Sequence, residues 1–267
     1  MGLDYAWAEP DPRLRRMVTP YCGYSERADE PVERRELTHP NVTVIVGFGP
    51  PLDFPERGFA RTSFVAGIEQ APVLTAHRRE QSGVQLNLSP LLAGMVFGVP
   101  AGELAREIVE LEDVVGADGR DLPERLHAAP DWDSRFAIVD RWLLRRLDAA
   151  SPPHAGVAAA WARLVASHGS ASIGELATEL GWSRRHLTER FTAAVGVPPK
   201  AYARILRFDR ARNLIGRADG TTLGQIALDS GYYDQAHLNR DFREFAGVPP
   251  TELEWLPNVQ DGVANAA

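Results

Sequence analysis

The feature that most constrains the fold is a near-repeat in the last third of the chain. The segment SIGELATELGWSRRHLTERFTAAVGVPP at 172–199 resembles TLGQIALDSGYYDQAHLNRDFREFAGVPP at 222–250. A matching alanine and glycine recur after 50 residues, and the final Gly-Val-Pro-Pro recurs after 51. Self-similarity at a fixed spacing indicates one supersecondary unit that is used twice.

Each unit carries the signals of a helix, a tight turn and a second helix. A hydroxyl residue opens each unit, and Glu or Gln follows three positions on, as in a capping box. Each first helix then meets a glycine, which readily adopts the left-handed conformation that ends a helix. A leucine and a phenylalanine four positions apart face inward from each second helix. These residues are Ser172, Glu175, Gly181, Leu187 and Phe191 in the first unit, and Thr222, Gln225, Gly231, Leu238 and Phe242 in the second.

The repeat resembles the DNA-binding domain of the AraC/XylS family of bacterial transcriptional regulators. The shared features are A-x3-G, a Phe ten or eleven residues after that Gly, and G-V-P-P. The segment YARILRFDRARNLI at 202–215 is similar to the family's Y-x-R with its later A-x2-L-[LI], and the resemblance covers about 155–256. It implies a regulator that binds double-stranded DNA, with RNA polymerase as a further partner if the regulator is an activator.

The resemblance implies an all-α C-terminal domain at 157–256. Its parts are a first helix-turn-helix at 172–194, a connecting helix at 199–216 and a second helix-turn-helix at 222–246. Before it, a linker is expected at 151–156, where small residues and prolines gather, and after it a disordered tail at 257–267.

A chain of 267 residues is too long for one core, so residues 1–150 are expected to form a second domain. We expect this domain to be β-rich to about residue 110, as a small barrel or jelly-roll-like sheet, and helical over 111–149. The whole chain is therefore predicted to be α+β. Its first part resembles, more loosely, the uncharacterised β-rich N-terminal domains of some actinobacterial AraC-type regulators, which implies small-molecule sensing or dimerisation.

The outward face of each second helix holds the candidate base contacts. With the leucine and phenylalanine inward, a step of about 100° per residue exposes the opposite face, which in the first unit also includes Thr192. By the resemblance, the residues that meet base edges are Arg185, Thr188 and Glu189, then Gln235, Ala236, Asn239 and Arg240. Arginine can donate hydrogen bonds to guanine O6 and N7, and Asn or Gln can pair with adenine N6 and N7. Alanine can contact a thymine methyl group.

Glu189 is unusual among residues expected to face DNA. A carboxylate near DNA is repelled unless it accepts a hydrogen bond, for example from cytosine N4. Either Glu189 selects cytosine, or the first helix reads loosely and the second dominates. Five further arginines are expected to contact phosphates and set register. They are Arg184, Arg190, Arg204, Arg207 and Arg243. For any exposed arginine, the alternative is a purely solvated side chain.

The charge of the chain is compatible with this prediction once it is divided between the domains. The formal net charge is −7, but residues 155–255 carry 12 Lys and Arg against 11 Asp and Glu. The excess acid lies in the first part of the chain. Two second helices held by one connecting helix can enter successive major-groove segments about 34 Å apart.

Local patterns in the first 150 residues predict strands at 42–48 and 83–90, the second with alternating apolar and polar residues that indicate a half-buried sheet. The Gly- and Pro-rich stretch 47–61 predicts a long loop. An apolar stripe from Trp132 to Leu147 indicates an amphipathic helix that either packs on its own domain or forms a homodimer seam.

The N-terminal half offers candidates for a small-molecule effector site but no named ligand. The candidate pocket residues are Trp7, Tyr24, His39, Phe48, Phe64 and His77. Scattered aromatics of this kind are also typical of an ordinary core. No cofactor or metal is predicted, because the histidines lack metal-site spacing and no phosphate-binding glycine motif is present.

No catalytic residue is predicted either. The single cysteine, Cys22, has no identifiable partner base, which favours a buried thiol over a nucleophile. The alternative functions are an enzyme with an N-terminal catalytic domain that the helix-turn-helix module targets to DNA, and a DNA-bending protein without sequence choice. Single-cysteine usage and the lack of a long apolar window favour a cytoplasmic, nucleoid-associated protein without membrane contact.

Overall fold

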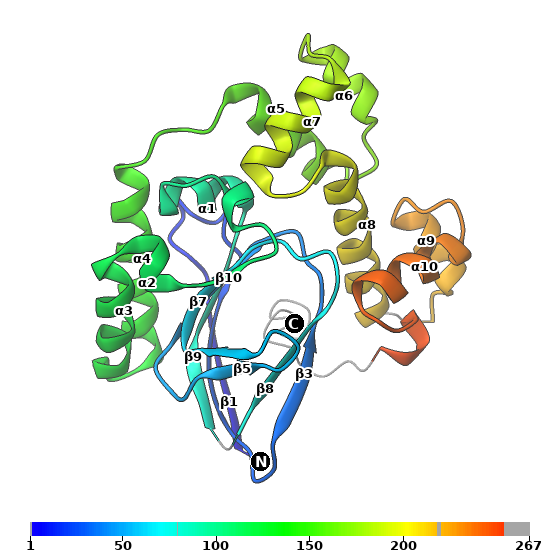
Figure 1. The fold of residues 1–267 in the computed structure, drawn as a ribbon. Coiled ribbons are helices and arrows are strands. Elements are labelled where there is room, and N and C mark those ends of the chain that lie inside the picture. The colour runs from blue at the N-terminus through cyan, green and yellow to red at the C-terminus, as the bar shows by residue number, and fades with distance from the viewer. Residues whose placement is uncertain (1, 79, 218–219, 254–267) are drawn as a thin grey trace.

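The computed structural model describes residues 2–78, 80–217 and 220–253 and has a β-rich N-terminal domain followed by a helical one (Figure 1). The strands are β1 Gly2–Ala8, β2 Tyr21–Arg27, β3 Val32–Glu36, β4 Val42–Gly47, β5 Leu52–Phe54, β6 Phe59–Arg61, β7 Ser63–Ala66, β8 Val73–His77, β9 Glu80–Leu88 and β10 Ile108–Glu110. The predicted α+β class is confirmed. The predicted tail at 257–267 lies outside the described residues.

The strands form two sheets that face each other. One has the order β1-β2-β9-β4-β7-β10, and the other has the order β3-β8-β5-β6. All named pairings are antiparallel, for example Val44 with Leu86 and Arg34 with Thr75. The arrangement is a sandwich of the jelly-roll-like kind that the sequence predicts.

Helices cover the outer face of the larger sheet (Figure 1). They are α1 Pro90–Phe97, α2 Leu111–Val115, α3 Ala117–Ala128 and α4 Trp132–Asp148, with the short 3-10 turn η1 Ala101–Leu104 after α1. Valines and leucines of β4 and β9 pack with Leu122, Phe136 and Trp142 in one core. The stripe on α4 is therefore packed on its own domain, so it does not provide the homodimer seam left open above.

The alternation at 83–90 has a different meaning from the one predicted. Val84, Leu86 and Leu88 lie under the helices, but Gln85 and Asn87 are buried too, because Gln85 lines a cavity between the two sheets and Asn87 lies at a hollow that also involves the C-terminal domain. A polar residue at every second position indicates a solvent-exposed face in a single sheet, whereas here these side chains face the sandwich interior and the neighbouring domain.

The loop predicted at 47–61 is wrong in its second part. Residues there form the β5–β6 hairpin, in which Phe54 pairs with Phe59 around a turn at Gly58 with φ +73°. Each strand has only three residues, too few for a period of two to be recognised.

The C-terminal domain contains α5 Ala155–Ala166, α6 Ile173–Glu179, α7 Arg184–Val195, α8 Pro199–Gly216, α9 Leu223–Asp229, α10 Gln235–Phe245 and the 3-10 turn η2 Pro250–Glu252. The long helix α8 joins the two helix-turn-helix units (Figure 1). Its Tyr202 packs on Phe191 of the first unit, and its Phe208 packs on Phe242 and Phe245 of the second. No helix among the described residues is both long and apolar enough to cross a bilayer.

Candidate nucleic-acid interface

The helix α7 and the helix α10 begin in the same way. Ser183 accepts a hydrogen bond from the backbone N–H of His186, and Asp234 accepts one from that of His237. Each start follows a glycine in the left-handed region, where φ is +67° at Gly181 and +82° at Gly231. The turn fixes where each second helix starts, and the cap satisfies its first N–H groups.

The C-terminal end of α7 is covered by the N-terminal domain. Gly102 of η1 packs so closely on the backbone of Ala193 that a Cβ added to it would lie 2.3 Å from the carbonyl oxygen of Ala193. Thr192 is half-buried, and its Oγ1 is enclosed without a hydrogen-bond partner among the described residues. Thr192 therefore does not belong to the exposed face on which the sequence predicts it.

The C-terminal end of α10 is held by the segment that follows β3. The backbone N–H of Thr38 donates a 3.2 Å hydrogen bond to the carbonyl of Phe245, and Leu37 packs against the core of the C-terminal domain. Arg35 lies against Gly247. Both second helices are thus anchored at their C-terminal ends by the N-terminal domain.

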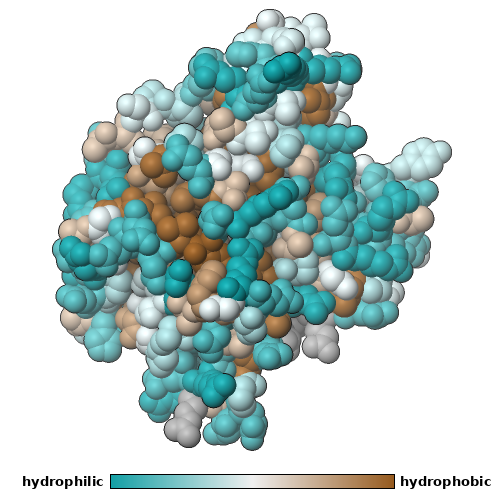
Figure 2. All heavy atoms as spheres, in the orientation of Figure 1, coloured by the Kyte–Doolittle hydropathy of each residue, from teal (hydrophilic) through white to brown (hydrophobic). Residues whose placement is uncertain are grey.

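The opposite, N-terminal halves of α7 and α10 carry the candidate base contacts. Exposed side chains are Arg185, Glu189, Gln235, Ala236 and Arg240; Thr188 and Asn239 are half-buried. Hydrophilic side chains cover the surface over α7 and over α10 in the space-filling view (Figure 2). The Oδ1 of Asn239 is buried without a partner among the described residues, so a base contact through that atom requires the amide to turn outward.

An ion pair links two of these candidates on α7. The Nε of Arg185 donates to Oε1 of Glu189 across 2.7 Å, and the side chains are 88% and 59% exposed. This bond uses the Nε–H of Arg185, and the terminal nitrogens carry the further donors with which an arginine can contact guanine O6 and N7.

The arginines expected at phosphates fall into two groups. Arg184, Arg190 and Arg243 are exposed on the second helices. In contrast, Arg204 on α8 bonds Asp241 at 2.7 Å and Glu244 at 2.6 Å and lies over the ring of Phe245. Arg207 donates to the carbonyl of Gly169 at 2.8 Å. These two arginines fix α8 to its neighbours, a role that sequence periodicity does not distinguish from an exposed one.

Tyr233 is not among the DNA contacts predicted from the sequence, but the structure exposes it beside them. It lies in the turn before α10 and is 88% exposed, while its neighbour Tyr232 is buried. An exposed tyrosine at the start of a second helix can donate its hydroxyl to a phosphate. The doublet of tyrosines after Gly231 was the available signal.

A cavity of about 110 Å³ lies between the two sheets of the N-terminal domain. Four of the six candidate pocket residues line it, namely Tyr24, His39, Phe64 and His77. Trp7 lies elsewhere, at the larger hollow beside α8, and Phe48 packs against Trp132 and Arg135 under α4.

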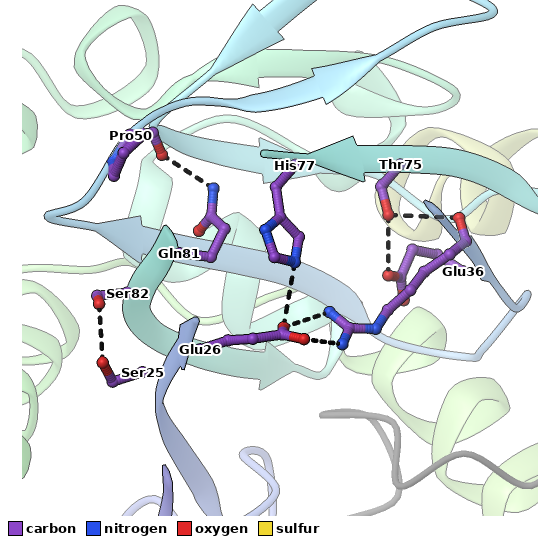
Figure 3. A network of polar contacts seen from close by, with 9 residues as sticks. Ser25, Glu26, Glu36, Pro50, Thr75, His77, Gln81 and Ser82 are labelled. Carbon is purple, nitrogen blue, oxygen red and sulfur yellow. Dashed lines mark hydrogen bonds and ion pairs between the residues drawn. The ribbon is translucent and has the colours of Figure 1, made fainter. Parts of the chain in front are cut away.

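A buried ion network forms one wall of this cavity (Figure 3). Arg34 donates to both oxygens of Glu26, at 2.7 and 2.6 Å, and His77 contacts Glu26 at 3.2 Å. Burial raises the pKa of Glu26, but the hydrogen bonds and charge of Arg34 outweigh it and leave that pKa below its ordinary value. Burial lowers the pKa of His77 more than Glu26 raises it. Glu26 and Arg34 are not among the pocket residues predicted from the sequence, although their period-two spacing from Tyr24 and Glu36 was a signal.

Cys22 is buried, and burial raises the pKa of its thiol to about 12. A thiol of that pKa is almost entirely protonated near neutral pH and is a poor nucleophile. The described residues contain no group of three His, Cys, Asp or Glu that could hold a metal ion.

A helix-turn-helix domain family matches residues 176–254. An uncharacterized HTH-type transcriptional regulator of Staphylococcus aureus (strain MSSA476) is 31% identical over 85 residues, which are 32% of this chain and 11% of that protein. The uncharacterized HTH-type transcriptional regulator YbfI of Bacillus subtilis (strain 168) is 30% identical over 67 residues, 25% of this chain and 24% of that one. The chain thus spans about a tenth of the length of the staphylococcal relatives it matches.

Among solved structures, ToxT from Vibrio cholerae is similar over 88% of this chain and 97% of its own, with a TM-score of 0.50 and 12% identity. At this identity the likeness shows the fold alone. It extends over both domains, whereas the sequence matches are confined to the second.

Proposed function

We propose that this chain, whose residues 176–254 are a helix-turn-helix domain of the AraC type, is a transcriptional regulator that binds double-stranded DNA in a sequence-specific manner. The observation that carries the proposal is the common disposition of α7 and α10. Each has an exposed, capped N-terminal half and a C-terminal end packed on the rest of the protein. In helix-turn-helix proteins the N-terminal residues of the second helix contact base edges.

Each helix would enter one segment of the major groove, and α8 would keep the two at a fixed spacing. Arg185 and Arg240 would bind guanine, Gln235 and Asn239 would bind adenine, and Ala236 would touch a thymine methyl group. Arg184, Arg190 and Arg243 would contact phosphates, together with Tyr233. Thr188 lies beside Arg185, and its hydroxyl already donates to the carbonyl of Arg184 at 2.9 Å, which favours a supporting role.

Glu189 has a third role besides the two considered from the sequence. Its bond to Arg185 would orient the guanidinium before DNA arrives. An oriented side chain loses less conformational entropy on binding than a free one. In that case Glu189 would act through Arg185 and would need no cytosine of its own.

The N-terminal domain would modulate DNA binding in response to a small molecule. Residues 37–39 support this proposal because they connect the cavity with the C-terminal domain. All three line the cavity between the sheets, and Leu37 and Thr38 contact the C-terminal domain. A ligand that displaces this segment would change the position of α10. It would shift the equilibrium between DNA-binding states only to the extent that it binds them with different affinity.

The experiment that tests the proposal is selection of genomic fragments by the full chain, followed by footprinting on the enriched site. The expected result is one enriched sequence with two protected segments one helical turn apart. Equal affinity for all sequences, with a steep dependence on salt, would instead identify a DNA-bending protein without sequence choice.

A further inference from the structure

The cavity between the sheets is lined by both polar and apolar side chains. The polar ones include the network of Glu26, Arg34 and His77 and the nearby Gln81 (Figure 3), and also Gln85. The apolar ones come from β4, β5, β7, β8 and β10. These are Ile45, Leu52, Phe54, Phe64, Val73 and Ile108. A ligand that contacts both kinds of side chain must be amphiphilic.

His77 determines which hydrogen bond the head group of that ligand must make. It is 2% exposed, and its Nε2 faces a carboxylate oxygen of Glu26 at 3.2 Å, so Nε2 carries the proton and donates. In a neutral imidazole the other nitrogen is then an acceptor. This Nδ1 is enclosed and has no hydrogen-bond partner among the described residues. A buried acceptor without a donor is costly, and a ligand hydroxyl or amine can satisfy it.

The charges around the cavity oppose an anionic ligand. Glu26 and Glu36 both line it, and the guanidinium of Arg34 already donates to both oxygens of Glu26. Glu69 lines it as well and is paired with Arg57. A carboxylate ligand brings only acceptors, so it would leave the Nδ1 of His77 without a donor and add a negative charge beside two others.

The size of the ligand follows from the volume. One water position requires roughly 10 to 15 Å³ of such volume, so about 110 Å³ accommodates on the order of ten non-hydrogen atoms. We propose that this cavity binds a small amphiphile whose hydroxyl or amine head donates a hydrogen bond to His77 and whose ring or short chain lies between the apolar side chains. This inference rests on the proposal that the N-terminal domain senses a small molecule.

Four matched probes test the class of ligand: benzyl alcohol, benzylamine, benzoate and toluene. Isothermal titration calorimetry on the full chain at pH 7.5 is expected to give binding of the alcohol and the amine, with benzoate at least about tenfold weaker. Equal or tighter binding of benzoate would overturn the proposal. So would the absence of binding by both the alcohol and the amine.

Two variants connect the binding to this cavity. Ala66→Leu places additional carbon atoms beside the apolar side chains of the cavity and is expected to abolish binding of the alcohol; Ala66→Val is the smaller substitution if the first does not fold. His77→Phe is expected to remove the advantage of benzyl alcohol over toluene, because the acceptor is lost. Unchanged binding by these variants would place the ligand elsewhere and contradict the proposal.

The DNA-binding proposal is measured separately, by gel shift of the same preparations on the selected site. If the probes fail to bind while the gel shift is intact, the inference about the ligand is wrong and the DNA-binding proposal stands. If the probes bind and no sequence is selected, the DNA-binding proposal fails and the cavity remains a binding site.

Discussion

Arg185 and Glu189 lie one helical turn apart on α7 and form a 2.7 Å hydrogen bond between Nε and Oε1. Both side chains are more than half exposed, and pairs of this kind contribute little to the stability of a helix. The consequence of the pair therefore concerns DNA. Glu189 offsets the charge of Arg185 and restricts its orientation at the surface that we propose enters the major groove.

Replacement of Glu189 separates these two effects. Glu189→Gln keeps the size of the side chain but removes a carboxylate from the DNA-facing surface, so affinity for unrelated DNA is expected to rise about threefold. Discrimination at the base that faces Arg185 is expected to fall, because the guanidinium is less oriented. Competition gel shifts with single-base variants of the selected site measure both. Glu179→Gln, at an exposed carboxylate on α6, is the control and should leave discrimination unchanged. Tighter discrimination by Glu189→Gln would contradict the orienting role.

Tyr233 is expected to contribute to affinity without contributing to specificity. Tyr233→Ala should weaken binding to all sequences about equally, by roughly threefold to tenfold, and Tyr233→Phe should lose the part that depends on the hydroxyl. Fluorescence anisotropy on matched and mismatched sites gives the comparison. Leu228→Ala removes another exposed apolar side chain from the same unit and should have no effect. A loss confined to one base position would show that Tyr233 reads sequence.

Asp241 and Arg204 are expected to hold α10 on α8. Asp241 is 1% exposed, and its Oδ1 accepts a 2.7 Å hydrogen bond from Arg204. Asp241→Asn removes a charged acceptor from this buried position and should lower the free energy of unfolding by about 2 kcal/mol. Glu244→Gln changes the more exposed partner of the same arginine and should cost less than about 1 kcal/mol. Urea unfolding followed by circular dichroism measures both. Equal losses would mean that the burial of Asp241 has no effect on the strength of the pair.

His39 is expected to make the protein less stable in acid. Its Nδ1 accepts from the N–H of Asn41 at 3.2 Å, and its Nε2 contacts Thr43 at 2.7 Å, an arrangement that requires the neutral ring. Burial, with a smaller effect of Arg212, lowers its pKa to about 3. An unfolded histidine has a pKa near 6.5, so the unfolded chain binds one more proton between these values. The stabilisation is complete above about pH 7 and is lost as the pH falls through 6.5 towards 3.

Removal of the His39 imidazole should make the free energy of unfolding depend less on pH. Between pH 7.5 and 5.5, His39→Gln is expected to lose about 1 kcal/mol less of its free energy of unfolding than the original chain. His168→Asn, which replaces an exposed histidine, should behave as the original chain does. Denaturant midpoints at the two pH values give the test. Identical losses for the original chain and His39→Gln would contradict the lowered pKa.

The C-terminal domain could be predicted from the sequence because its signals are local. The caps at Ser172 and Thr222 and the left-handed Gly181 and Gly231 lie at the predicted residues. Each of these features is predicted by a single residue type that favours one backbone conformation. Each also occurs in both units of the repeat, which strengthens the prediction. The exposure of Arg185 and Arg240 follows from the same helical periodicity.

The cavity could not be predicted, because it depends on contacts between residues far apart in the chain. Glu26 pairs with Arg34 and His77 only when β2, β3 and β8 come together across two sheets. For the same reason Arg204 could not be distinguished from an exposed arginine. Its partner Asp241 is 37 residues away, on α10. Periodicity predicts that helix but not how it lies against α8.

The central claim is that the N-terminal halves of α7 and α10 read base sequence, and the most direct test is the base preference of Arg240→Ala on the selected site. The expected result is a loss of about 1 to 3 kcal/mol that disappears when one particular base pair is changed. Arg243→Ala, at an exposed arginine of the same helix, should weaken binding to every sequence equally. Affinity and base preference that are both unchanged in Arg240→Ala would contradict the account.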